Sequence, residues 1–178
     1  AGDSYGIFGF SCIGRHNVQF YTIKGMEEPL NDKIKKRIDR IAPIHGTRMG
    51  PDIRHIAAKL DEVEARTKIL LLLSDGRPQD CDYGSDPYEA RWDAVGAYSR
   101  GMRLQEWIER NSREYAVHDT RMSLLEAKQR GITPFCISVD KQGHDYLKTM
   151  CADFSYEVVD DVSSLPSRLI SLYKSITT

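Results

Sequence analysis

The pattern of apolar and polar positions divides the chain into short strands that alternate with amphipathic helices. The clearest strand is the apolar run from Ile69 to Leu73, which stops at Ser74. A short, continuous apolar run of this kind is typical of a strand that is buried on both faces of a parallel sheet. A second such run, 132–140, ends on Asp140, just as Asp75 follows Ser74 after the first run. From Ile34 onward helices and strands alternate, which predicts an α/β fold with an open, mostly parallel sheet flanked by helices.

The first part of the chain predicts a β-hairpin followed by two helices. Residues 5–12 and 18–24 are rich in aromatic and β-branched side chains, so they are predicted to form two paired strands. Asn31 is a good N-cap for a helix that Pro43 ends. The apolar face of this helix is predicted to consist of Ile34, Ile38 and Ile41. After a compact loop, Pro51 suits the first turn of a second helix.

The second half of the chain contains an unusual polar, turn-rich stretch after the central strand. Residues 84–115 are predicted to be an insertion that carries a helical segment and folds over one end of the sheet. Asp119 is then predicted to cap a helix that ends at Gly131. The remaining elements are a short helix around Tyr146, a strand at 156–159 and a closing helix with Pro166 in its first turn.

Length and composition indicate one ordinary globular domain, 1–178. The chain is 40% hydrophobic and 29% charged with a formal net charge of −1, so its overall charge gives no reason to expect nucleic acid or an anionic membrane as a partner. No apolar run approaches the length of a membrane-spanning helix. Cys12 and Cys136 fall in strand-like runs and are predicted to be core residues, while Cys81 is either a loop cysteine or a nucleophile. Without metal-ligand or disulfide spacing, the cysteines favour a reducing, cytoplasmic location.

The candidate chemistry is that of oxygen ligands. The sequence contains no phosphate-binding loop, dinucleotide fingerprint or nucleophile elbow. If the strands are parallel, Thr47 and Asp75 lie at the same rim of the sheet, where ligands bind in open α/β folds. Their oxygens, with that of Ser74, suit Mg²⁺ or another hard divalent cation, but they are too few to hold it tightly. The alternative is an α/β phosphatase or hydrolase that uses Asp75, although the candidate second carboxylates, Asp80 and Asp82, lie far along what is expected to be a flexible loop.

Several motifs resemble those of a von Willebrand factor A domain, and most closely the C-terminal A domain of the NorD and CbbO group. They are Gly46-Thr-Arg-Met-Gly50, Leu70-Leu-Leu-Leu-Ser-Asp-Gly-Arg-Pro78, Asp119-Thr-Arg-Met122 and Gly131-Ile-Thr-Pro-Phe-Cys-Ile-Ser-Val-Asp140. The resemblance implies a metal-ion-dependent adhesion site to which Thr47 and Asp75 contribute. The Asp-x-Ser-x-Ser loop of the family is missing, so the chain is expected to begin after the first strand of that fold. The strands matching the second and fourth of the family are expected either to close directly on each other or to be completed by a neighbouring copy.

The resemblance also implies a function without catalysis. Relatives of this kind work with a MoxR-type AAA+ ATPase (the NorQ or CbbQ kind) to activate a client metalloenzyme or rubisco. The expected role is therefore a metal-dependent protein-interaction module, in which the ion bridges to a carboxylate of the partner and is weakly bound or absent in this fragment. The insertion 84–115 is expected either to shape partner choice or to serve as a solubilising flap.

Overall fold

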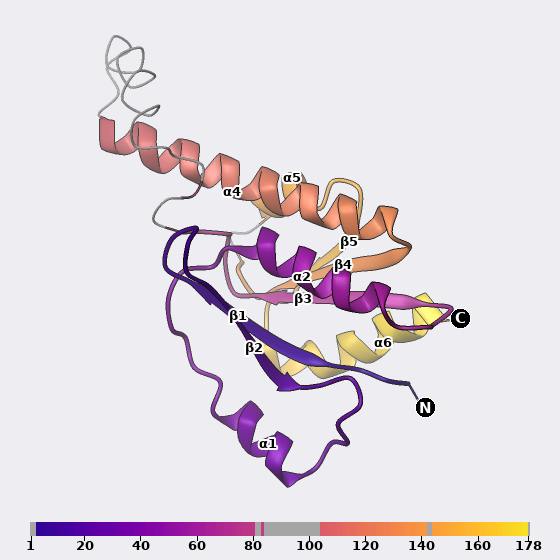
Figure 1. Ribbon diagram of the computed structural model, residues 1–178. Helices are drawn as coiled ribbons and strands as arrows, with labels where there is room; N and C mark the ends of the chain where they lie inside the picture. Colours follow the sequence, from indigo (N-terminus) through magenta and orange to yellow (C-terminus); the bar gives the residue numbers. More distant parts are fainter. Residues whose placement is uncertain (1–2, 81–82, 84–103, 142–143, 178) are drawn as a thin grey trace.

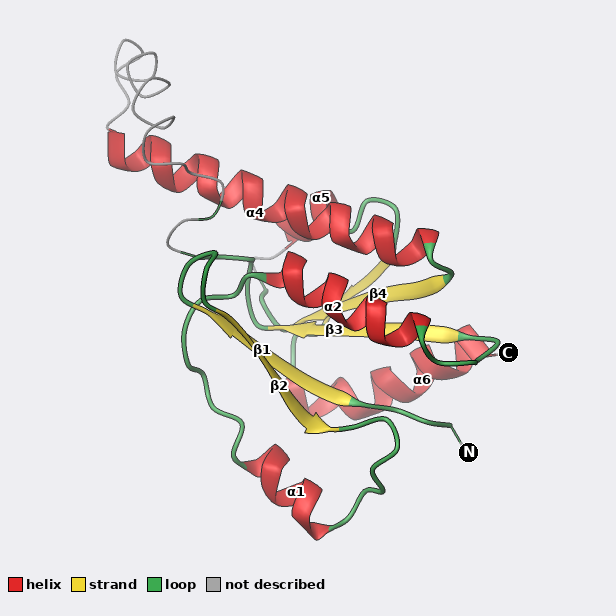
Figure 2. Cartoon of the chain, in the orientation of Figure 1, coloured by secondary structure: helices red, strands yellow, loops and turns green. Residues whose placement is uncertain are grey.

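The strands of the chain form two separate sheets in the computed structural model, which describes residues 3–80, 83, 104–141 and 144–177. The first is an antiparallel hairpin of β1 (Ile7–Cys12) and β2 (Val18–Lys24). The second is a parallel sheet in the order β3 (Lys68–Ser74), β4 (Ile132–Ser138) and β5 (Ser155–Val158). Figure 2 shows the hairpin and the parallel sheet as distinct groups of strands. The fold is therefore α/β with a parallel sheet, as the alternation of elements predicts.

Helices cover both faces of the parallel sheet. The described helices are α1 (Asp32–Asp39), which lies beside the hairpin, α2 (Met49–Asp61), α4 (Leu104–Gln129), α5 (His144–Met150) and α6 (Leu165–Thr177), with a short 3₁₀ turn, η1 (Val162–Ser164), before α6. In Figure 1, α2, α4 and α5 lie on one side of the sheet and α6 on the other. Pro51 lies in the first turn of α2, as predicted.

The main core lies between the parallel sheet and the layer of α2, α4 and α5. Its centre contains side chains that are almost completely buried, among them Met49, Leu124, Leu147 and Cys136. Cys12 and Cys136 are buried, as expected of core cysteines. A smaller core on the opposite face joins β4 to α6.

The edge strand β3 is buried on one face only, which corrects the prediction from its apolar run. Leu70 and Leu72 belong to the main core, but Leu71 is 40% exposed and Leu73 50% exposed. The reason lies in the position of α6, whose leucines pack around Phe135 and Ile137 of β4. Helix α6 thus covers the neighbouring strand and leaves the second face of β3 open.

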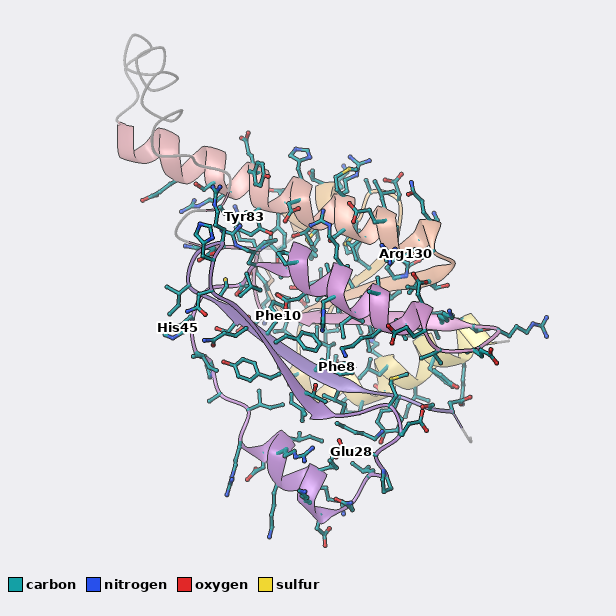
Figure 3. The ribbon with its side chains drawn as sticks, in the orientation of Figure 1. Phe8, Phe10, Glu28, His45, Tyr83 and Arg130 are labelled. Carbon is teal, nitrogen blue, oxygen red and sulfur yellow. The ribbon has the colours of Figure 1, made fainter. Side chains whose placement is uncertain are left out.

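The hairpin contacts α2 through side chains and forms no backbone strand pairing with β3. Phe20 stacks on Phe8, with ring centroids 5.3 Å apart, and meets the edge of His55 on α2 at 4.4 Å. Phe10 packs against the main core, and Figure 3 shows it between the hairpin and α2. The expected direct closure of the two strands is therefore wrong, because β1 pairs with β2 and β3 with β4. Completion of the sheet by a neighbouring copy stays a prediction.

Helix α1 begins as predicted and ends earlier than predicted. The side chain of Asn31 accepts a hydrogen bond from the backbone N–H of Ile34 at 3.1 Å, which confirms the N-cap. The helix stops at Asp39, before Pro43 is reached. Of the predicted apolar face only Ile34 is buried, because α1 rests on β2 and its remaining surface is left open by the described residues. Ile41 is 57% exposed.

Helix α4 corrects the predicted boundary between insertion and domain. Residues 104–115 are the first part of a continuous 26-residue helix, so Asp119 lies in mid-helix and does not cap it. The physical reason is that neither Gly nor Pro occurs between Leu104 and Gln129, so nothing interrupts the helix. Gly131, with a φ of 74°, follows the helix and ends it, as predicted. The rest of the expected insertion, 84–103, lies outside the described residues.

Candidate functional site

Thr47 and Asp75 lie at the same rim of the molecule, as the sequence predicts. Asp75 directly follows β3 and is exposed, while Thr47 lies in the loop before α2 and is half-buried. The backbone N–H of Thr47 donates to the carbonyl oxygen of Gln79 at 2.7 Å, and the N–H of Gln79 donates back at 3.0 Å. This pair of bonds holds the Thr47 loop beside the segment that leaves β3.

The hydroxyl of Ser74 closes the turn that presents Asp75. It donates to the carbonyl oxygen of Gly76 at 2.6 Å and accepts from the N–H of Gly76 at 3.3 Å. Side chains of serine often form such local bonds at the end of a strand. Ser74 therefore fixes the turn, and this bonding competes with its predicted use as a third oxygen ligand.

A buried ion pair stands behind the Thr47 loop. The guanidinium of Arg48 donates through Nε to Asp80 at 2.8 Å, and the two side chains are only 9% and 2% exposed. The second carboxylate oxygen of Asp80 accepts from the backbone N–H of Gly14 at 3.0 Å. Burial, and then the charge of Asp80, raises the pKa of the Cys12 thiol to about 12. The expectation of a flexible loop at Asp80 is wrong, since this side chain joins three segments of the rim.

The crowding around Gly46 explains why the loop carries glycine at that point. Gly46 exchanges two backbone hydrogen bonds with Cys12, at 2.9 and 3.1 Å. A Cβ on Gly46 would lie 3.0 Å from the carbonyl oxygen of Gln79 and 3.1 Å from both Asp80 and the sulfur of Cys12. Any larger residue would push apart the backbone pairs that hold Thr47.

The ion pair continues as a polar chain to α4. The ring of Tyr83 lies 4.1 Å from the guanidinium of Arg48, and its hydroxyl donates to Asp119 at 2.7 Å. Arg54 of α2 then donates to Asp119 at 2.9 Å and to Glu126 at 2.7 Å. Burial, followed by the bond to Asp119, holds the pKa of Tyr83 well above its usual value. Figure 3 shows Tyr83 at the rim, beside the first part of α4.

Asp119 thus has a different function from the helix cap that its sequence context predicts. It is the acceptor that joins Tyr83 to Arg54, and a Cβ on Gly50 would collide with its carboxylate. A side chain at position 50 would therefore displace the Asp119 carboxylate from its bonds to Tyr83 and Arg54. The neighbouring Thr120 is bonded inside α4, to the carbonyl oxygen of Ala116 at 2.8 Å.

A second set of polar groups follows β4 at the same rim. The N–H of Val139 donates to the carbonyl oxygen of Ser74 at 3.2 Å, so the ends of β3 and β4 stay side by side. The N–H of Asp140 donates to the hydroxyl of Ser138 at 3.1 Å, and that hydroxyl lies 3.4 Å from Tyr146. Arg77 lies over the ring of Tyr146, 5.2 Å from its centroid. The rim therefore combines two carboxylates with a guanidinium and an aromatic ring.

The described residues do not by themselves complete a tight metal site. No group of three His, Cys, Asp or Glu side chains with the geometry to hold an ion occurs in the described part of the chain. Thr47 and Asp75 supply oxygen donors of the type that Mg²⁺ prefers, but a hard cation needs about six. The hydrolase alternative receives no geometric support either, because Asp80 is held by Arg48 and Asp82 lies outside the described residues.

One buried carboxylate has no equivalent among the predicted site residues. Asp52, in the first turn of α2, is 4% exposed, and its Oδ2 atom has no hydrogen-bond partner among the described residues. Loss of water around this group raises its pKa to about 7. The sequence does carry a signal for it. Asp52 lies on the apolar side of an amphipathic helix, beside Ile53 and one turn before Ile56.

The rim, with a parallel sheet behind it and loops from several segments around it, has the form of a ligand-binding edge in an open α/β protein. The chain is 32% identical over 160 residues to protein NorD of Stutzerimonas stutzeri and 30% identical over 175 residues to protein NorD of Brucella melitensis. These matches span 90% and 98% of the chain but 22% and 23% of the two relatives. An uncharacterized protein of Pseudomonas aeruginosa is 31% identical over 98% of the chain and 24% of its own length. These similarities support a NorD-like family for this stretch.

Other comparisons place limits on what the similarity shows. The chain spans about a quarter of the length of the curated relatives that it matches. No family model matches the chain, and no solved structure matches it. Among the described helices, none combines the length and the apolar character needed to cross a bilayer.

Proposed function

We propose that this chain is an interaction module of a NorD-like accessory protein, with the von Willebrand factor A type of fold. The observation that carries the proposal is the shared position of Thr47 and Asp75 at the carboxyl end of β3, with the Thr47 loop fixed by its backbone pair with Gln79. The similarity to proteins named NorD supports the accessory role over a catalytic one.

The proposed chemistry is metal-bridged recognition. Thr47 and Asp75 would supply two oxygen ligands to Mg²⁺ or another hard divalent cation, and Asp75 is exposed toward an approaching partner. The remaining ligands come from outside the described residues: from water, from a carboxylate of the partner or from other parts of the parent protein. The ion itself would supply the positive charge that attracts that carboxylate.

The proposed partners are a MoxR-type AAA+ ATPase, of the NorQ or CbbQ kind, and a client metalloenzyme or rubisco that the two proteins activate together in the cytoplasm. This part of the proposal rests on the NorD resemblance of the sequence and on the position of the rim. The surroundings of Asp75 fit a protein partner, since Arg77 is exposed and arginine is enriched at protein interfaces.

The test measures binding of the chain to a purified NorQ-type ATPase in the presence of Mg²⁺ by surface plasmon resonance. We expect binding that EDTA abolishes and that both Thr47→Ala and Asp75→Asn weaken by at least about tenfold, the equivalent of 1.4 kcal/mol. The matched controls are Thr149→Ala and Asp145→Asn, which alter exposed groups on α5. The parent-length protein should be tested beside the chain, because it can supply ligands that the chain does not.

Two outcomes would count against the proposal. Binding by parent-length protein that is equally strong in EDTA and in the Asp75→Asn variant would remove the metal from the mechanism. Phosphatase activity that survives Thr47→Ala and disappears in Asp75→Asn would instead establish the hydrolase alternative.

A further inference from the structure

Helix α1 and the segment that follows it form a projecting part of the molecule, attached at two points. Ile34, which is 1% exposed, anchors α1 against the hairpin. Arg37 donates to the carbonyl oxygen of Ile23 at 3.1 Å and to Glu28 at 3.2 Å. At the far end, Gly46 is held by its two backbone bonds to Cys12. Figure 1 shows α1 below the hairpin, apart from the body of the molecule.

Four large apolar side chains of residues 30–44 are exposed. They are Leu30 at 53%, Ile38 at 36%, Ile41 at 57% and Ile44 at 53% exposure. Residues 41–44 belong to neither a helix nor a strand. Single exposed apolar side chains are ordinary on a protein surface. Four large aliphatic side chains exposed within 15 consecutive residues are a higher density than such scattered exposure.

The same segment concentrates positive charge. Between Asp32 and Ile44 there are five cationic side chains and two carboxylates, a balance of +3 in a chain whose formal net charge is −1. Arg37 serves to anchor the helix, and Lys35 lies 3.2 Å from Asp32. The other cations, Lys33, Lys36 and Arg40, are exposed beside the isoleucines. An occupant of this surface must therefore be both apolar and acidic.

The arrangement fits a protein partner better than a membrane or a nucleic acid. Of the exposed isoleucines only Ile38 lies on α1, so this short helix does not present the broad apolar face of a membrane-surface helix. Ile41 and Ile44 lie in irregular backbone. The stretch 30–44 contains no aromatic residue on which a base could stack. Burial of isoleucine against a partner is favourable, whereas a phosphate backbone offers it nothing.

We propose that residues 30–44 are a docking surface for an acidic, apolar segment of a partner protein. The four apolar side chains, here called the isoleucine cluster, contact its leucine-like residues, and Lys33, Lys36 and Arg40 contact its carboxylates. The segment continues along the chain into the loop that carries Thr47. The proposal does not depend on a metal at the rim.

The probe is a synthetic amphipathic helical peptide of Glu and Leu, labelled with a fluorophore and titrated in EDTA. We expect it to bind at least about tenfold more tightly than two control peptides, one with Ser in place of Leu and one with Lys in place of Glu. Reversing two charges with Lys33→Glu and Lys36→Glu should remove that preference. The double variant Ile41→Ser and Ile44→Ser should weaken binding by about tenfold or more.

Matched controls exclude general effects of charge and exposure. Ile170 has the same 57% exposure as Ile41 and lies on α6, so Ile170→Ser should leave binding unchanged. Lys59→Glu on α2 serves as the control for charge, and circular dichroism checks that each variant is folded. The EDTA makes the result independent of the proposed metal site, so the two proposals fail separately.

Any of four results would overturn the proposal. They are absence of peptide binding, equal binding of the Glu/Leu and Glu/Ser peptides, an Ile170→Ser effect as large as that of the isoleucine variants, and tighter binding to vesicles containing phosphatidylserine than to the peptide. Concentration-dependent sedimentation that the Ile41→Ser and Ile44→Ser variant abolishes would instead assign the surface to a second copy of the chain.

Discussion

The parallel-sheet body and the hairpin region of this molecule are held together by different kinds of interaction. In the body, α2, α4 and α5 enclose a continuous core in which residues such as Leu124 and Met150 are at most 1% exposed. In the hairpin region, β1 and β2 are mostly half-buried, and α1 contributes a single fully buried side chain, Ile34. Polar contacts at the rim and aromatic contacts to α2 connect the two.

This difference shows that the position of the candidate site depends more on the contacts between the hairpin region and the body than on the core of the body. Thr47 belongs to the loop between the two regions, and its position follows from Cys12 on one side and Gln79 on the other. Asp75 is carried by the body alone, since β3 ends directly before it. Substitutions at the rim should therefore move Thr47 away from Asp75 without unfolding the parallel-sheet body.

The largest effect is expected from the buried ion pair that joins the regions. Asp80→Asn removes the buried carboxylate charge that pairs with Arg48, which should lower the free energy of unfolding by about 3–5 kcal/mol in urea titration. Asp61→Asn is the control, because its pair with Arg130 is 39% and 45% exposed, and we expect less than about 1 kcal/mol there. A similar small loss for both variants would show that the rim pair does not hold the regions together.

The two cores should respond differently to the same truncation. Leu124→Ala creates a cavity in the body and should cost about 2–5 kcal/mol of global stability. Ile34→Ala should mainly release α1, so hydrogen exchange should accelerate in α1 while α4 stays protected. Equal loss of protection in both helices after Ile34→Ala would mean that the hairpin region and the body unfold as one unit.

The buried carboxylate of Asp52 should make stability depend on pH. Its pKa of about 7 in the folded protein lies above the ordinary aspartate pKa of 3.8, so its contribution is fully favourable below pH 3.8 and is lost as the pH rises through 7. Between these values the loss is about 1.4 kcal/mol per pH unit, as an upper estimate. Asp52→Asn should therefore stabilise the protein more at pH 8 than at pH 5, as measured by thermal unfolding. A constant difference between variant and wild type would contradict this assignment.

The smallest effect is expected at the contact between Glu28 and Arg37. Both side chains are more than a third exposed and screened by solvent, so Glu28→Gln should leave global stability almost unchanged. A backbone hydrogen bond from Gly25, and then Arg37, keeps the pKa of Glu28 below its usual value, so the wild-type contact should weaken only in acid. NMR shifts of α1 during acid titration, with Glu27→Gln as the control, measure this directly. Identical titration in Glu28→Gln would assign the change to another group.

Most elements of the fold could be predicted because their signals are local. The apolar runs of β3 and β4, the cap at Asn31 and the stop at Gly131 each depend on a few neighbouring residues, and the structure confirms them. The rim position of Thr47 and Asp75 also followed from the order of elements. The predicted cap at Asp119 was wrong because the same residue type accepts hydrogen bonds at a helix start or from a neighbouring helix, and sequence does not distinguish the two.

The polar chain at the rim could not be predicted, since its members are far apart in sequence. Arg48 and Asp80 are separated by 32 positions and Arg54 and Asp119 by 65, and only the packing of α2 against α4 brings them together. The open face of β3 is likewise a tertiary result, because Leu71 and Leu73 are as apolar as their buried neighbours.

The sequence by itself determined the alternation of strands and helices, the parallel sheet and the side of that sheet where candidate ligands lie, because hydrophobic period and turn residues act over a few positions. Tertiary structure alone decided which apolar faces are covered, that the hairpin stands apart from the parallel sheet, and which partner each buried charge receives. Those outcomes depend on distances between segments that are remote along the chain, and no local pattern specifies such distances.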